Sequence, residues 1–245
     1  MKTLLDMSND ALTAGNVKGC AIMELLAWPN LLRVLPFEDT PSDTFMKIAG
    51  GDLDVDKADL QRDLSERSRQ EATQVRKLSR HLNRILIEGD TSKDPRDPSG
   101  LRRRVRQSHI VKGPVSPETL AAGFKLVPKA THLLMSNTTL QENRFPMVWD
   151  KDEWGHRVAS YGWADPEVFH LTPILLAGLD ESDQPILPHG AFVLRLGEAG
   201  FHGVQNGPPE VTDLGLMQAK PVLRTRVEWL INLVDHPDSI AFITG

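Results

Sequence analysis

The sequence has little cysteine and no long apolar run. Cys20 is the single cysteine among 245 residues, so no internal disulfide can form, and a small secreted domain held together by disulfides is excluded. The two most apolar stretches, Ala21–Trp28 and Leu171–Leu179, are interrupted by Glu24 and Pro173. Neither approaches the roughly 20 apolar residues that a membrane-spanning helix needs. The sequence therefore predicts no contact with a membrane.

Excess positive charge is missing too. Lys and Arg number 28 against 33 Asp and Glu, which gives a net charge of −5. This balance excludes a protein that coats nucleic acid through bulk positive charge. Hydrophobic residues make up 40% and charged residues 25% of the chain, as in a folded chain and unlike a disordered one. The length fits one large or two small domains with a sizeable core.

Motifs for catalysis and metal binding are also absent. The eight histidines are widely spaced, and none forms the HExxH or His-x-His pattern by which one helix or loop presents two zinc ligands. There is no Gly-x-Ser-x-Gly nucleophile elbow. We therefore expect no catalytic, cofactor-binding or metal-binding residues, no cofactor and no enzymatic activity. A soluble metal-dependent enzyme using His132, His156 or His170 stays as a remote alternative.

One long helix is the clearest regular element. Between Leu60 and Leu86, apolar residues recur three and four positions apart, while most other positions are charged. The pattern predicts a helix of about 30 residues, or about 45 Å, with Asp54 or Asp56 capping its start and Gly89 ending it. Because its apolar stripe is narrow, the helix must lie across a surface instead of being enclosed.

The rest of the chain alternates between short elements and loops. The basic residues 102–106 fit a solvated face or a strip of intersubunit salt bridges better than a phosphate-binding site, because no aromatic residues interleave them. The remaining expected elements are a short helix in 21–28, a loop or short hairpin over 38–52, a turn-rich loop over 91–100, a helix capped by Ser116, a strand over 130–136 followed by a helix from Ser136 or Asn137, a β-rich stretch over 156–204, and a strand pair within 221–243 broken near His236.

The order of several segments carries a resemblance to a known family. The segments are Arg84-Ile-Leu-Ile-Glu-Gly89-Asp90, Ser99-Gly100-Leu101, Ala130-Thr-His-Leu-Leu-Met-Ser136, Pro173-Ile174, Asp180–Leu187, Val211-Thr-Asp-Leu-Gly215, Pro221–Trp229 and His236-Pro237, after an opening from Leu4-Leu5 to Val34-Leu-Pro-Phe37. In this order they resemble the major capsid proteins of tailed bacteriophages and prophages, which have the Hong Kong 97-type fold. The resemblance runs from about residue 4 to 245.

The resemblance implies an α+β shell subunit with four parts. Residues 1–37 correspond to an N-terminal arm and residues 38–52 to an extended loop, which is shorter here than is usual in the family. Residues 53–100 and 216–245 correspond to a peripheral domain that contains the long spine helix. Residues 101–215 correspond to an axial domain. On the strand near the C-terminus, alternating charges suit cross-strand or intersubunit pairs.

The resemblance also implies a structural function. The chain would be a capsid protein that self-assembles, as pentamers and hexamers, into the icosahedral head of a phage particle. That head would form in the cytoplasm of a bacterial host and enclose DNA without sequence-specific binding, with scaffold, portal and decoration proteins as further partners. The alternative within the same fold is an encapsulin-like bacterial compartment. The residues expected at assembly contacts are Arg62, Arg69, Arg76, Arg224, Arg226 and Glu228.

Overall fold

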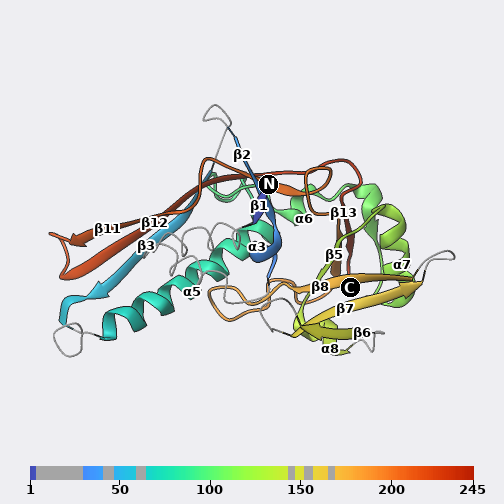
Figure 1. Ribbon diagram of the computed structural model, residues 1–245, viewed down its shortest axis with the longest axis horizontal. Coiled ribbons are helices and arrows are strands. Elements are labelled where there is room, and N and C mark those ends of the chain that lie inside the picture. The colour runs from blue at the N-terminus through green and yellow to red at the C-terminus, as the bar shows by residue number, and fades with distance from the viewer. Residues whose placement is uncertain (4–29, 41–46, 59–64, 143–146, 152–156, 165–168) are drawn as a thin grey trace.

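The part of the chain that the structure describes forms two β-sheets joined by one long helix (Figure 1). The computed structural model describes residues 1–3, 30–40, 47–58, 65–142, 147–151, 157–164 and 169–245. Helices and mainly antiparallel strands are mixed along the chain, which confirms the expected α+β class.

The first sheet contains both ends of the predicted arm and the long strand that precedes the last one. Its strands are β1 (Lys2–Thr3), β2 (Pro36–Asp39), β3 (Lys47–Asp56), β10 (His202–Gln205), β11 (Glu210–Leu216) and β12 (Val222–Val234). The order is β1-β2-β10-β12-β11, and β3 pairs with β12 on the side opposite β10 and β11. Strand pairing thus crosses the expected boundary between residues 215 and 216, because β10 and β11 hydrogen-bond to β12.

The second sheet is built from the middle of the chain and its C-terminal end. Its order is β4-β13-β9-β5-β8-β7-β6. These strands are β4 (Ile110–Val111), β5 (His132–Met135), β6 (Met147–Lys151), β7 (Arg157–Ala164), β8 (Phe169–Leu176), β9 (Ala191–Leu194) and β13 (Ile240–Ile243). The helical elements are α3 (Leu31–Val34), α5 (Ser65–Glu88), α6 (Leu101–Arg104), the 3₁₀ turn η1 (Gln107–His109), α7 (Pro117–Leu126) and α8 (Asn137–Glu142).

The long helix is present as α5, and of the two expected caps the structure supports Asp56. The Asp56 side chain accepts a 2.8 Å hydrogen bond from the amide of Ala58, and residues 57–58 directly after it are helical. Asp54 was wrong as a cap, because it lies within β3. The physical reason is the alternation Asp52-Leu53-Asp54-Val55-Asp56, which has the two-residue period of a strand with one buried face. The expected end is confirmed, since α5 stops at Glu88 and the Gly89 amide donates to the Ile85 carbonyl at 2.9 Å.

Two apolar clusters form the core. In the first, the stripe of α5 packs against the inner face of the first sheet, with Leu78, Leu82, Val227 and Trp229 all 7% exposed or less. In the second cluster, α7 packs against the second sheet, and Phe124 of α7 is one of the buried residues of this cluster. The narrow stripe predicted for the long helix is thus the side that contacts the sheet.

Local helix signals are borne out where the structure describes them. The Ser116 hydroxyl accepts from the Thr119 amide at 3.3 Å and the Thr119 hydroxyl accepts from the Ser116 amide at 2.9 Å, which is a capping box. The Ser136 hydroxyl accepts from the Thr139 amide at 2.9 Å at the start of α8. The helix expected over 21–28 lies outside the described residues.

Two expectations about strands need correction. The stretch 38–52 is not an isolated loop or hairpin, because its described ends belong to β2 and β3, which pair with β10 and β12. The two strands expected within 221–243 exist, but β12 and β13 belong to different sheets. The chain leaves the first sheet after Val234 and enters the second at Ile240, so the break near His236 is a passage between sheets instead of a hairpin turn.

Candidate assembly surface

The most extended part of the molecule is a three-stranded tongue. We use the name tongue sheet for β3, β11 and the paired residues 222–228 of β12, which lie beside α5 at the left of Figure 1. On β12, odd-numbered residues such as Val227 and Trp229 face the core, whereas even-numbered residues face outward. The outer face is therefore the polar face of the tongue sheet.

A ladder of ion pairs crosses this outer face. Arg224 binds Asp54 through two hydrogen bonds of 2.6 and 2.7 Å, and Arg226 binds Asp52 through two of 2.7 and 3.1 Å. Arg224 also lies 3.1 Å from Asp52. The hydrogen bond from Arg226 lowers the pKa of Asp52, and that from Arg224 lowers the pKa of Asp54. The ladder ties β3 to β12 within one chain.

The residues expected at assembly contacts therefore divide into groups. Arg224 and Arg226 form cross-strand pairs within the chain. Glu228 lies exposed on the same face, directly opposite Glu210 of β11. Arg76 is exposed on α5, Arg69 lies on the same helix, and Arg62 lies outside the described residues. Whether any of them contacts a second copy stays a prediction.

The two edges of the tongue sheet differ. At the β3 edge, Gln74 of α5 accepts from the Asp54 amide at 2.7 Å and donates to the Asp54 carbonyl at 2.5 Å, so at this one residue of the edge a side-chain amide takes the place of a neighbouring strand. At the other edge, β11 pairs with no strand except β12 among the described residues. The edge strand β11 also carries Leu214 and Leu216, which are 43% and 52% exposed.

The basic segment 102–106 is neutralised within the chain. Each of its four arginines has an acidic neighbour: Arg102 with Glu88 at 3.6 Å, Arg103 with Asp90 at 2.5 Å, Arg104 with Asp235 at 2.5 Å, and Arg106 with Asp238 at 3.7 Å. The segment is thus a strip of intramolecular salt bridges, and these pairs leave little net positive charge for a phosphate backbone.

A second cluster of ion pairs connects α5 to the loop after β8. We call residues 180–185 of this loop the strap. Arg80 pairs with Asp183, His81 pairs with Glu181, and Arg84 Nε lies 3.1 Å from Glu181 Oε2. Burial raises the pKa of Glu181, but hydrogen bonds from its own backbone, His81 and Arg84 outweigh burial and lower that pKa overall. The strap fastens the second sheet to the helix that packs on the first.

Sequence reasoning missed the strap, and it indicated cross-strand pairs for the ladder without identifying their acidic partners. The signal for the ladder was the alternation of acids in 52–56 and of charges in 224–228, which are complementary once paired. The signal for the strap was the acidic loop 180–183, but nothing local links it to α5, about 100 residues earlier.

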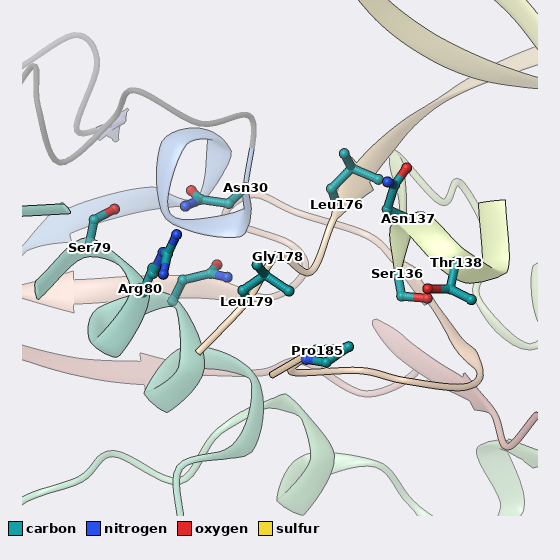
Figure 2. A pocket seen from close by; sticks show the side chains of 11 residues that line it. Asn30, Ser79, Arg80, Ser136, Asn137, Thr138, Leu176, Gly178, Leu179 and Pro185 are labelled. Carbon is teal, nitrogen blue, oxygen red and sulfur yellow. The ribbon is translucent and has the colours of Figure 1, made fainter. Parts of the chain in front are cut away.

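A pocket of about 320 Å³ lies beside the strap (Figure 2). Figure 2 shows Ser79 and Arg80 from α5 on one side, Ser136 and Thr138 at the start of α8 on the other, and Leu179 near the centre. Asn83 of α5 also lines it and is only 2% exposed. The Asn83 Nδ2 atom donates to the Ala177 carbonyl at 2.6 Å, while its Oδ1 atom accepts no hydrogen bond from any residue that the structure describes.

The described part of the structure does not bring together the histidines considered for a metal site. His132 contacts the Thr131 hydroxyl at 2.9 Å, and burial lowers the pKa of its imidazole to about 4. His156 and the side chain of His170 lie outside what the structure describes. Across the described ranges, no three His, Cys, Asp or Glu side chains converge in a way that could hold a metal ion. In the same ranges, no helix is long and apolar enough to cross a bilayer.

Comparison with known proteins finds similarity in structure. No protein-family model and no curated protein sequence matches the chain. Among solved structures, the chain is similar to the SrpI encapsulin of Synechococcus elongatus, with a TM-score of 0.62 and 15% identity over 87% of this chain and 85% of that one. It is similar to the capsid of an empty GTA particle, with a TM-score of 0.57 and 14% identity over 88% and 89%. It is also similar to a virus-like particle of Pyrococcus furiosus, with a TM-score of 0.53 and 10% identity over 91% and 95%.

These structures share an architecture with the chain across nearly its whole described length, although their sequences have diverged widely. The mixed sheets, the long helix beside a tongue of strands and the coverage of both chains agree with the fold implied by the order of segments. The chain therefore has the Hong Kong 97-type fold of capsid and encapsulin shell subunits.

Proposed function

We propose that the protein is a structural shell subunit, many copies of which assemble through pentamers and hexamers into an icosahedral phage head that encloses DNA. The observation that carries the proposal is the fold, because three shell or particle subunits match 85% or more of their own length. The described surface supports it: the tongue sheet projects from the rest of the molecule, and one of its edges is open. An extended shape with an open strand edge is suited to contact between neighbouring copies.

We also propose the four parts that the resemblance implies. Residues 53–100 and 216–245 form the peripheral domain, 101–215 the axial domain, 1–37 the arm and 38–52 the short extended loop. Two separate sheets support two structural units, and the first apolar cluster spans their junction, because it also contains Leu134, Phe192 and Ile240 of the second sheet. In this arrangement the strap is a fastening between the peripheral and axial domains.

The wall of such a shell confines DNA without binding it tightly. The net charge of −5 and the neutralised arginines of 102–106 support this role, because tight binding requires uncompensated cations facing the phosphates. Scaffold, portal and decoration proteins are the further partners of this proposal. The particle forms in the cytoplasm of a bacterial host and becomes part of the virion.

An encapsulin-like compartment is the second candidate. Its support is that the chain is similar in fold to the SrpI encapsulin as well as to the GTA capsid. The two candidates share the subunit fold and differ in what the shell encloses.

Electron microscopy and sedimentation of the purified full chain test the proposal. We expect closed particles that sediment far faster than a subunit of 27.3 kDa. A chain that stays monomeric over a wide range of concentration and salt would refute both candidates. The neighbouring genes separate them: portal, terminase and protease genes support the phage head, and a gene for a single cargo protein supports the compartment.

A further inference from the structure

The loop between β10 and β11 projects from one edge of β12. The last pair of the β10–β12 register is Gln205 with Ile231. The first pair of the β11–β12 register is Glu210 with Glu228, so four residues of the loop stand against only two of β12. The extra residues leave the plane of the strand pairing, as they do in a wide β-bulge. The loop sequence is Asn206-Gly207-Pro208-Pro209, and it contains the one Asn-Gly pair of the chain.

This loop exposes a side-chain amide and leaves the next backbone amide free. Asn206 is exposed, and its side chain forms no hydrogen bond with any residue that the structure describes. Its backbone amide donates to the Leu230 carbonyl at 3.1 Å, which holds the start of the loop on β12. The two prolines carry no N–H. The Gly207 amide is therefore the one N–H group of the loop that donates to no acceptor in the described part of the chain.

Gly207 also gives this amide freedom to turn. Its φ is +78°, in a region that glycine adopts without steric cost. A Cβ at Gly207 would meet no described atom within 4 Å, so no packed neighbour holds the loop on this side. The backbone nitrogen of Gly207 and the side-chain Cγ of Asn206 belong to adjacent residues, and rotations about a few single bonds bring them together. Reactions between groups held this close are strongly favoured over the same reactions between separate molecules.

We propose that Asn206-Gly207 is a self-modification site at which Asn206 loses its side-chain amide without an enzyme. The Gly207 nitrogen attacks Cγ of Asn206, forms a C–N bond and loses its proton, while the Cγ–Nδ2 bond breaks and Nδ2 leaves as ammonia. The product is a five-membered succinimide ring. Water then opens the ring at one of its two carbonyls and leaves either aspartate or isoaspartate. The net reaction consumes one water and releases one ammonia, and it needs no oxidant or reductant.

The new carboxylate enters a stretch of chain without basic side chains. Residues 203–219 contain no Lys or Arg, and Glu210 of this stretch already lies opposite Glu228. Like charges that face each other in a sheet are destabilising, so a further negative charge here is not compensated. Conversion of Asn206 takes the net charge of the chain from −5 to −6. The proposal does not depend on the shell function. In a long-lived particle, however, every copy carries this site, and the converted fraction records the age of the particle.

Ageing of the purified full chain tests the site. We expect Asn206 to convert at a rate within about tenfold of that of a free peptide with the sequence of residues 203–210, and faster at mildly alkaline pH than at neutral pH because the Gly207 amide must lose its proton. Peptide mapping by mass spectrometry measures the conversion, and methylation by an isoaspartyl methyltransferase detects the isoaspartate. Asn137 is the internal control, because it is exposed but precedes Thr138, whose β-branched side chain hinders the attack. Its conversion should be at least about tenfold slower.

Two variants separate this site from any other change of charge. Asn206→Gln places the amide one methylene farther from the backbone and should abolish the acidic form that appears on ion exchange as the wild type ages. Asn206→Asp should elute with that acidic form from the start. An Asn206 that stays intact after the peptide has converted, an Asn137 that converts as fast, or an acidic form that persists in Asn206→Gln would each overturn the proposal. These outcomes leave the shell function untouched, because sedimentation of the unaged chain measures assembly separately.

Discussion

Gly203 of β10 is a position where one added methyl group should have a large local effect on packing. It lies beside Phe37 in the parallel β2–β10 pair. A Cβ at Gly203 would stand 2.1 Å from Cε1, 2.3 Å from Cδ1 and 2.9 Å from Cζ of Phe37. Carbon atoms in contact are normally about 3.5–4.0 Å apart, so Gly203→Ala requires the ring to move by about 1.5 Å.

The surroundings of Phe37 leave little room for that movement. Phe37 is 1% exposed, and its ring centroid lies 4.6 Å from that of Trp229, which is 2% exposed. Overfilling a packed core costs about 1–3 kcal/mol, while replacing glycine restrains the unfolded chain and returns about 0.4–1 kcal/mol. We expect Gly203→Ala to lower the free energy of unfolding by about 1–2 kcal/mol net.

Urea unfolding of the full chain, below the concentration at which it assembles, measures this change through circular dichroism and tryptophan fluorescence. Gly51→Ala is the matched control in the same sheet, because its Cβ would stand 3.5 Å from Leu78 Cδ1, an ordinary contact. In a Phe37→Leu background the added methyl group should cost clearly less than in the wild type. An unchanged midpoint for Gly203→Ala, or an equal penalty in both backgrounds, would refute the steric reasoning.

Three further predictions concern buried and edge groups. The wild type should lose stability as pH falls from 6.5 toward 4, because burial lowers the pKa of His132 to about 4 and the folded state resists protonation of this imidazole. The loss of stability has an upper limit of about 3 kcal/mol. The variant His132→Gln should show a flatter pH dependence of the urea midpoint over that interval. Gln74→Leu removes both hydrogen bonds to the Asp54 backbone; it should cost about 1–3 kcal/mol and speed hydrogen exchange of the Asp54 amide, and an unchanged exchange rate would contradict the assigned edge role. Asp52→Asn should lower the free energy of unfolding by no more than about 1 kcal/mol, since the ion pair between Asp52 and Arg226 is partly exposed. Because the pKa of Asp52 is lowered in the folded state, this ion pair stabilises the wild type fully above the unfolded-state pKa and stops doing so as pH falls through the folded-state pKa. The stabilities of the variant and the wild type should therefore converge in acid and in high salt.

Elements specified by neighbouring residues were predictable from the sequence. The apolar stripe of α5, its end at Gly89 and the capping box at Ser116 each depend on residues within a few positions of one another. Of the two expected caps, Asp54 was wrong, although an aspartate is a good helix cap in isolation. It lies in a strand because Arg224, 170 residues later, pairs with it.

The assembly surface was predictable only in part for the same reason. The alternating charges of 224–228 correctly indicated a strand with cross-strand pairs, but sequence alone could not say that Asp52 and Asp54 are the partners. The open edge of β11 and the strap follow from which strands meet in space. Such information comes from long-range packing, which residue spacing does not contain.

Strand β12 has a mechanical consequence for a shell. Its residues Val222–Val234 run without interruption from the tip of the tongue sheet to the passage between the sheets, a length of about 43 Å at 3.3 Å per residue. An extended strand hydrogen-bonded on both sides resists stretching, so it acts as a stiff beam. A load applied by a neighbour at the tip is delivered to the far end, where Asp235 pairs with Arg104. In the proposed shell, such a load would therefore reach the joint between the sheets, where the ion pairs of the strap and of Asp235 lie beside a buried apolar cluster that contains residues of both sheets.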